Sequence, residues 1–236
     1  ISDGADASGG ISPCSVVVGS VGAVSTSVDI ASSNVDGYNE ALRLLNARGL
    51  TTSVTGYGTV CYNRGIFDMS LIIVPSGIKL KAIESSVTFR LNSNTNQLLN
   101  IYGQGTVEGI NFDANGRPFS ARMIQLTSGG IFQDNHVYGA QNMTDGEYET
   151  NIIAVKNTFG AIIRRNYFEN AKMLNNPVFF GDIGSIRITN STGVYFSENI
   201  IKVDKILAGG QLMQVMGSSQ VWIEDNTIEN ANAIFL

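Results

Sequence analysis

The stretch VYFSENII (194–201) is one of four copies of a single pattern in the second half of the chain. The other copies are IFQDNHV (131–137), IIRRNYF (162–168) and VWIEDNTI (221–228). Each copy contains an asparagine, with one apolar residue three positions before it and another two positions after it. Period-two alternation on both sides of a polar corner indicates two short strands that share one inner face. The four asparagines, spaced by 31, 33 and 27 residues, are Asn135, Asn166, Asn199 and Asn226.

The pattern is part of a longer repeat, in which three short strands are separated by turns rich in glycine, serine and asparagine. Five segments align: 97–115, 123–142, 152–172, 185–205 and 212–232, with Ile110 at the asparagine position of the first. A strand repeat with a period of about 20–50 residues is typical of a solenoid, whose coils bury their inner faces only by stacking. An inward asparagine at one corner of each coil can hydrogen-bond to the next coil, so we predict a parallel β-helix with an asparagine ladder.

The N-terminal part contains one convincing helix. In SSNVDGYNEALRLLNARG (32–49), Asp36 can cap the helix and Gly49 can end it, which predicts a helix over about 36–48. The helix carries an apolar stripe formed by Tyr38, Ala41, Leu42 and Leu45. This stripe would let the helix cover the open end of the solenoid as a plug. We expect strands at 58–63, 67–74 and 77–83.

We divide the chain into an N-terminal arm or linker (1–33) and a single β-helix (34–236). Residues 1–31 alternate weakly and suit an edge strand, an arm or the end of a preceding domain. The C-terminal end shows no capping element, so we expect an open coil that is truncated or covered by a partner.

Composition excludes several classes of protein. Charged residues are only 15% of the chain, below the roughly 25% of an average soluble domain. The formal net charge is −5 and no basic cluster occurs, which argues against a nucleic-acid partner. No apolar run is long enough to insert into a membrane. Cys14 and Cys61 match no zinc spacing; we expect two free thiols, with one disulfide as the alternative.

At this level of detail the chain resembles the right-handed parallel β-helix family of pectate lyases and bacteriophage tailspikes. The resemblance covers roughly residues 34–236 and rests on VDGYNEALRLLNARG (35–49), the VPSG turn (74–77) and GQGTVEGINFDANG (103–116). It implies an all-β, right-handed, single-stranded parallel β-helix with an N-terminal capping α-helix. It also implies a homotrimer in a virion tail or outside the cell, a carbohydrate ligand and no cofactor. These motifs specify the fold far better than the chemistry.

In this family, the strand before the asparagine-ladder strand lines the ligand groove, together with the loops that precede it. The corresponding strands are LLNIY, MIQLT, NIIAVK, SIRIT and QLMQVM. Their outward residues include no carboxylate, so the calcium ligands of a pectate lyase are missing. The resemblance and the residue types suggest five substrate-binding residues: Tyr102, Lys156, Arg187, Gln214 and, in a neighbouring loop, Tyr148.

Acidic residues beside this face are the candidates for catalysis. Glycoside hydrolysis needs two carboxyl groups, about 5–5.5 Å apart for retention of configuration and about 6.5–9.5 Å apart for inversion. A pair from adjacent loops could flank a glycosidic bond, and each acid could equally be a solvated loop charge. The candidates are Asp145, Glu147, Glu149, Asp182 and Asp204.

A second acidic set stands immediately before the ladder asparagines and includes Asp134, Glu198, Glu224 and Asp225. Arg165 occupies the same column between Asp134 and Glu198, which indicates cross-strand charge pairing. The single histidine, His136, should point outward. We predict no metal site.

These observations favour a tailspike-like β-helix that binds and hydrolyses bacterial surface polysaccharide, such as capsule or O-antigen. One alternative is a non-catalytic structural or adhesin fragment. The other is a secreted polysaccharide lyase with Arg187 or Lys156 as its base.

Overall fold

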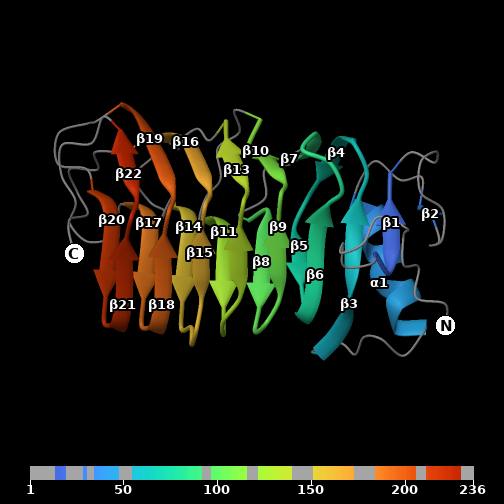
Figure 1. Ribbon diagram of the computed structural model, residues 1–236, viewed down its shortest axis with the longest axis horizontal. Helices are drawn as coiled ribbons and strands as arrows, with labels where there is room; N and C mark the ends of the chain where they lie inside the picture. Colours follow the sequence, from blue (N-terminus) through green and yellow to red (C-terminus); the bar gives the residue numbers. More distant parts are fainter. Residues whose placement is uncertain are drawn as a thin grey trace.

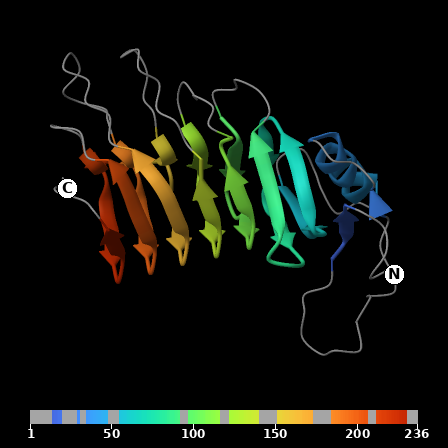
Figure 2. The ribbon, with the colours of Figure 1, turned by 90° about the horizontal axis from the view of Figure 1, so that it is seen from above.

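A computed structural model describes residues 14–19, 29–30, 35–47, 55–91, 97–115, 122–139, 151–172, 184–205 and 211–229. Three parallel sheets wind around one axis as a right-handed parallel β-helix (Figure 1), which confirms the predicted fold class. Each complete coil places one strand in each sheet, in the order sheet 1, sheet 2, sheet 3. The single described helix, α1 (Val35–Ala47), lies at the N-terminal end of the stack (Figure 2).

The strand bounds follow this winding. Sheet 1 contains β5 (Ile72–Val74), β8 (Leu99–Tyr102), β11 (Arg122–Thr127), β14 (Asn151–Lys156), β17 (Gly184–Thr189) and β20 (Gln211–Met216). Sheet 2 contains β2 (Asp29–Ile30), β1 (Val16–Val18), β3 (Thr55–Tyr62), β6 (Ser76–Ala82), β9 (Thr106–Glu108), β12 (Ile131–Gln133), β15 (Ile162–Arg164), β18 (Thr192–Ser197) and β21 (Ser219–Glu224). Sheet 3 contains β4 (Gly65–Met69), β7 (Val87–Leu91), β10 (Asn111–Asp113), β13 (His136–Tyr138), β16 (Tyr167–Lys172), β19 (Ile200–Lys205) and β22 (Thr227–Glu229).

The predicted asparagine ladder is present at the corner between sheets 2 and 3. The Nδ2 group of Asn166 donates to Oδ1 of Asn199 at 3.0 Å, and Asn199 repeats this contact to Asn226. Each of these Nδ2 groups also donates to a main-chain carbonyl, that of Phe132 or Ile163. At the N-terminal end of the ladder, Oδ1 of Asn135 accepts from the backbone N–H of Ile110. Ile110 is the position at which the sequence repeat lacks its asparagine.

A second ladder, which the sequence analysis missed, runs along the corner between sheets 1 and 2. The backbone N–H of Thr158 donates to Oγ of Ser191, and the N–H of Ser191 donates to Oγ of Ser218. Their hydroxyl groups donate in turn to main-chain carbonyls, such as Leu126 O for Thr158. Polar side chains therefore satisfy the buried backbone at two of the three corners.

Apolar side chains from all three sheets fill the interior between these corners. The apolar residues that alternate with the outward ones on sheet 1 are buried from β8 to β17, and Val215 on β20 is partly buried. The residues flanking Asn135, Asn166 and Asn199 are buried too. Five aromatic rings form a continuous inner row, namely Phe89, Phe112, Phe132, Phe168 and Phe196. The centroids of consecutive rings are 5.6 to 6.5 Å apart. Burial of each large ring stabilises the stack by roughly 2–3 kcal/mol.

Two sequence predictions for the N-terminal part require correction. The expected single strand 67–74 is two strands in different sheets, β4 and β5, because the chain turns at Ser70 and Leu71. The helix begins at Val35, so Asp36 lies in its first turn and does not precede it. The apolar stripe is as expected, with Tyr38, Ala41 and Leu45 buried and Leu42 packed against the core.

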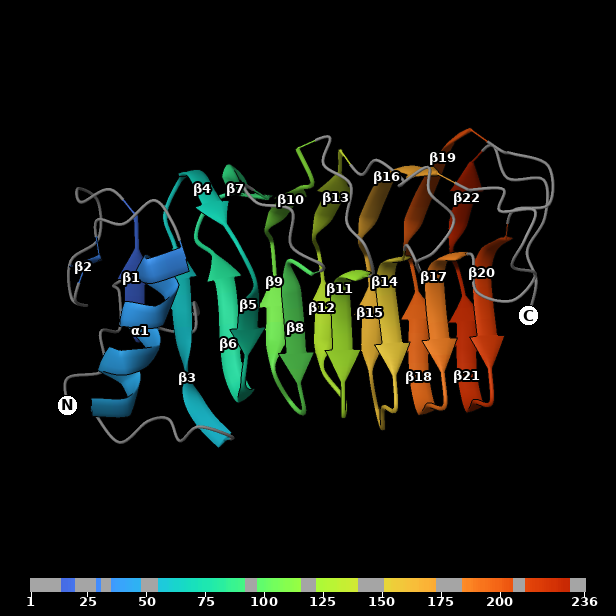
Figure 3. The same ribbon diagram turned by 180° about the vertical axis from the view of Figure 1, so that it is seen from behind.

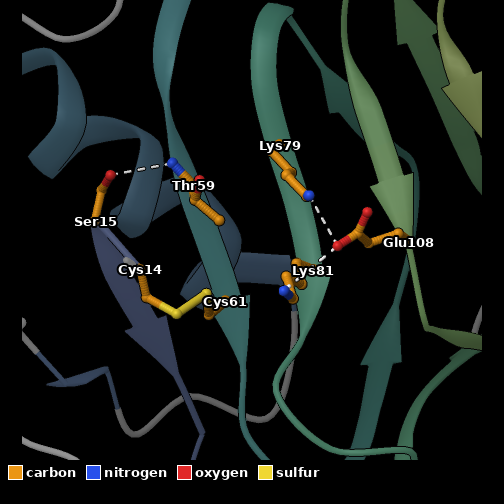
Figure 4. The surroundings of a disulfide bond; sticks show 7 residues. All are labelled: Cys14, Ser15, Thr59, Cys61, Lys79, Lys81 and Glu108. Atoms are coloured by element: carbon orange, nitrogen blue, oxygen red, sulfur yellow. Dashed lines mark hydrogen bonds and ion pairs between the residues drawn. A yellow bond between two sulfur atoms is a disulfide. The ribbon is translucent and has the colours of Figure 1, made fainter. Parts of the chain in front are cut away.

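The expectation of two free thiols is wrong, because Cys14 and Cys61 form a disulfide (Figure 4). The bond becomes possible because β1 adds to sheet 2 as a parallel neighbour of β3, pairing Val17 with Cys61. The backbone N–H of Ser15 donates to Thr59 O, and Oγ of Ser15 accepts from the N–H of Thr59. Part of the N-terminal arm therefore extends sheet 2 of the solenoid, with β1 between β2 and β3.

On the outer face of sheet 2, Glu108 lies among two lysines (Figure 4), with Nζ of Lys79 at 2.8 Å and Nζ of Lys81 at 3.5 Å. Burial acts to raise the pKa of this carboxyl, but hydrogen bonds from Lys79 and Gln133 and the two ammonium charges outweigh burial and lower the pKa. The ionised form of Glu108 is therefore bound more favourably in the folded protein than in the unfolded chain.

We predict that Glu108→Gln lowers the free energy of unfolding at pH 7 by about 1 kcal/mol. The difference from wild type should be present above the unfolded-state pKa of about 4.3 and should vanish as the pH falls through the lower folded-state pKa. Urea denaturation at neutral and acidic pH measures this. Glu224→Gln, in the same column without a described ion pair, is the matched control. An unchanged difference at acidic pH would contradict the prediction.

Candidate functional site

The strands of sheet 1 lie side by side along the stack (Figure 3). Their outward residues form two parallel rows that cross successive coils. The strand registers align the first row as Ile73, Asn100, Gln125, Ala154, Arg187 and Gln214. They align the second row as Tyr102, Thr127, Lys156, Thr189 and Met216. Four of the five predicted substrate-binding residues therefore lie on one face, within these rows.

The two rows differ in exposure. Asn100 and Gln214 of the first row are each only 8% exposed, whereas Tyr102 and Met216 at the ends of the second row are 37% and 43% exposed. The alternation rule places the first row outward correctly, but it does not predict that several of its members are covered. Ile73 at the N-terminal end of the first row is 45% exposed, so the covered part of that row begins at Asn100.

A directed chain of hydrogen bonds links the rows on β8 and β11. Nε2 of Gln125 donates to Oγ1 of Thr127 at 2.8 Å, and the Thr127 hydroxyl donates to Oδ1 of Asn100 at 3.2 Å. Nδ2 of Asn100 then donates to the Tyr102 hydroxyl at 2.9 Å. Because Tyr102 accepts the last hydrogen bond, its own O–H is available to donate away from the sheet. Successive bonds of this kind polarise one another.

Two cations lie next to each other farther along the face. The register pairs Ala154 with Arg187 and Lys156 with Thr189, which makes Lys156 and Arg187 diagonal neighbours on adjacent strands. The buried Oγ1 atom of Thr189 has no hydrogen-bond partner among the described residues. The described outward residues of this face include no carboxylate. Nε and Nη1 of the Arg187 guanidinium are buried. Positive charge beside the hydrogen-bonding groups of Thr127 and Tyr102 suits an anionic, hydroxyl-rich ligand.

Of the five acidic candidates for catalysis, only Asp204 lies within the described residues. Asp204 lies in β19, which belongs to sheet 3 and not to the face described above. Asp145, Glu147, Glu149 and Asp182 lie outside the described residues, as does Tyr148. The structure therefore brings together four of the five predicted binding residues and places Asp204 on another sheet.

In the charge column at the corner of sheets 2 and 3, Arg165 and Asp134 pair as the alternating signs predict. Arg165 forms two hydrogen bonds to the Asp134 carboxylate, at 2.7 and 2.8 Å. The hydrogen bonds to Asp134 raise the pKa of the Arg165 guanidinium, and the charges of Asp134 and Glu198 act in the same direction. His136 points outward on sheet 3, where its Nε2 lies 3.1 Å from the Glu169 carboxylate. No group of three or more histidine, cysteine, aspartate or glutamate residues in the described part could hold a metal ion.

Comparison with known proteins supports the fold. The chain is similar to the crystal structure of a putative glycosyl hydrolase from Parabacteroides merdae. The TM-score is 0.55 at 8% sequence identity, over 88% of this chain and 93% of that protein. A likeness at this identity concerns the path of the backbone. No protein-family model matches the sequence, and no curated protein matches it. Within the described residues, no helix has the length and hydrophobicity needed to cross a membrane.

Proposed function

We propose that this protein is a tailspike-like β-helix that binds bacterial surface polysaccharide along the outer face of sheet 1 and hydrolyses it. The observation that supports binding most directly is Lys156, which lies in register with Thr127 of the hydrogen-bond chain that ends at Tyr102. The Lys156 ammonium suits the carboxylate of an acidic sugar, and the Tyr102 hydroxyl suits a sugar oxygen. The solved protein of similar fold is named a glycosyl hydrolase, which favours carbohydrate over other anionic polymers.

Hydrolysis would be performed by carboxylates in the segments that precede sheet 1 strands along the chain. Asp145, Glu147 and Glu149 precede β14, and Asp182 precedes β17. One carboxyl group would protonate the glycosidic oxygen while the other activates water or attacks the sugar. Asp204 remains a candidate through its position ahead of β20.

The positive charge of this face favours a second candidate activity. A polysaccharide lyase removes a proton next to a uronic-acid carboxylate, and Lys156 or Arg187 would be its base. A non-catalytic adhesin would use the same face for binding alone.

The location and assembly that we propose rest on separate grounds. Disulfides persist outside the cytosol, so the Cys14–Cys61 bond supports an extracellular or virion-tail location. A homotrimer is proposed by analogy with tailspikes.

A depolymerisation screen on capsular and O-antigen polysaccharides tests the activity. New reducing ends without ultraviolet absorbance would identify a hydrolase, and absorbance from unsaturated ends would identify a lyase. Binding without either signal would favour the adhesin. Failure to bind any acidic polysaccharide would contradict the proposal.

We predict that Lys156→Gln weakens binding to an acidic polysaccharide about tenfold, the loss of one charge-assisted contact. Binding of a neutral polysaccharide should change little. Lys202→Gln on sheet 3 is the matched control, since it removes the same charge from another face. Calorimetric titration with polygalacturonate, at low salt because screening weakens such contacts, measures the effect. Equal losses in the two variants would show a non-specific charge effect.

A further inference from the structure

An open groove of about 560 Å³ crosses the corner between sheets 2 and 3, on a different face from the rows of sheet 1. Its lining begins at Ile83 and Glu84, in the turn after β6, and ends at Glu198 and Ile200, four coils farther along the stack. At roughly 4.8 Å between coils, the groove extends for about 19 Å along the helix axis. Its volume falls within the range of about 300–1,000 Å³ that is typical of ligand sites.

The groove is rich in carboxylates. Glu84, Asp134 and Glu198 line it, whereas Arg165 is its one arginine or lysine. Asp134 takes both hydrogen bonds from Arg165, and Glu84 forms no ion pair with another described residue. A ligand with positive charge at both ends of its bound segment would complement Glu84 and Glu198.

One wall of the groove carries aromatic and apolar side chains on either side of the polar Asn111. His136 and Tyr167 occupy neighbouring positions on β13 and β16, with ring centroids 4.9 Å apart and planes within 25°. Ile200 continues this row on β19 and is 44% exposed, and Ile83 is 38% exposed at the other end. Such surfaces remove the C–H faces of a ring-shaped ligand from water while its polar groups reach the carboxylates.

The spacing of the coils along the groove distinguishes a polysaccharide ligand from an extended peptide. Its groups recur once per coil, about every 4.8 Å, whereas an extended peptide repeats about every 3.3–3.4 Å and would lose register along the axis. A chain of pyranose rings advances by nearly one coil spacing per ring and would keep register. We propose that this groove binds a cationic glycan of amino sugars, with ammonium groups at Glu84 and Glu198 and ring faces against Tyr167 and Ile200. This site goes beyond the proposed function, because it lies on another face and selects the opposite charge.

Titration of the full chain with a chitosan oligosaccharide and with its fully N-acetylated counterpart tests the proposal, because the two differ only in charge and acetylation. In mildly acidic, low-salt buffer, the free-amine glycan should bind at least about tenfold more tightly, and added salt should reduce this preference. Equal affinity for the two glycans, or no binding of the free-amine glycan, would overturn the proposal. Oligolysine that binds as tightly as the glycan would also overturn it, because the groove would then recognise any cation.

Substitutions locate the site. Glu84→Gln and Glu198→Gln should each weaken binding of the free-amine glycan by about threefold to tenfold, as expected for exposed charge pairs. Glu224→Gln, an exposed carboxylate outside the groove lining, should leave binding unchanged. Equal effects of all three substitutions would overturn the assignment. Lys156→Gln, which alters the sheet 1 face, should not weaken binding of this glycan, so failure of either site is distinguishable from failure of the other.

Discussion

Replacement of Asn199 by alanine is expected to lower the free energy of unfolding by about 3–5 kcal/mol. Asn199 is fully buried, and its Oδ1 accepts from both the backbone N–H and the Nδ2 group of Asn166. Its Nδ2 donates to Oδ1 of Asn226 and to the carbonyl of Ile163. Alanine removes all four bonds and leaves the N–H of Asn166 and the carbonyl of Ile163 buried without these partners. Each such group costs about 1–3 kcal/mol when it remains unsatisfied.

Two further substitutions make this experiment specific to the ladder. Asn226→Ala should cost less than Asn199→Ala, because Asn226 is only partly buried and ends the described ladder. Asn111→Ala, on the exposed side of sheet 3, removes one long hydrogen bond to Ser85 O and should cost under about 0.5 kcal/mol. Urea denaturation ranks the three variants. A loss below about 1 kcal/mol for Asn199→Ala would show that the ladder adds little to stability.

The coil architecture could be predicted from sequence because its decisive pattern is local and repeated. Each ladder asparagine stands between two inward apolar positions of the same short segment, as Phe196 and Ile201 do around Asn199. Register then follows, because a shift by one residue would expose the apolar set. The second ladder was equally readable in principle. Thr158, Ser191 and Ser218 are spaced by 33 and 27 residues, the same intervals as the last three ladder asparagines. Serine and threonine are common in turns, so this repeat could not be distinguished from the ordinary composition of turns.

The strand error at 67–74 also had a signal in the sequence. Phe67 and Met69 are inward at odd positions, and Ile72 and Val74 are inward at even positions. A change of parity within an apolar run marks a turn, because one strand cannot bury both sets. The covered residues of the sheet 1 face had no such signal. Alternation predicts on which side of a strand Asn100 lies, but not what packs over that side.

The groove between sheets 2 and 3 depends on distant parts of the chain. Glu84 and Glu198 are far apart in sequence, and only the stacking of coils brings both to one groove. In the sequence, Glu198 belongs to the charge column before the ladder asparagines, and no pattern connects it with Glu84. The pairing of Cys14 with Cys61 was missed for a similar reason. It depends on the addition of β1, a strand of three residues whose short pattern specifies its position only weakly.

Removal of the disulfide is expected to lower the free energy of unfolding by about 2–4 kcal/mol. The bond closes a loop with a sequence separation of 47, which restricts the unfolded chain and makes folding less costly in conformational entropy. The loop includes α1, which packs against β1 and β3 at the end of the stack. The tether therefore holds both β1 and the helix against the first strands of the solenoid.

The double variant Cys14→Ser, Cys61→Ser tests this expectation in urea, with and without a reductant. Reductant should lower the stability of wild type to that of the variant and should leave the variant unchanged. Hydrogen exchange should show where the loss occurs: the amide of Asn63, which donates to Val18 O, should exchange faster, whereas the amide of Asn166 in the ladder should not. If the variant kept the stability of oxidised wild type, the backbone hydrogen bonds of β1 would suffice to hold the end of the stack. The disulfide would then be a marker of an oxidising compartment and not a source of stability.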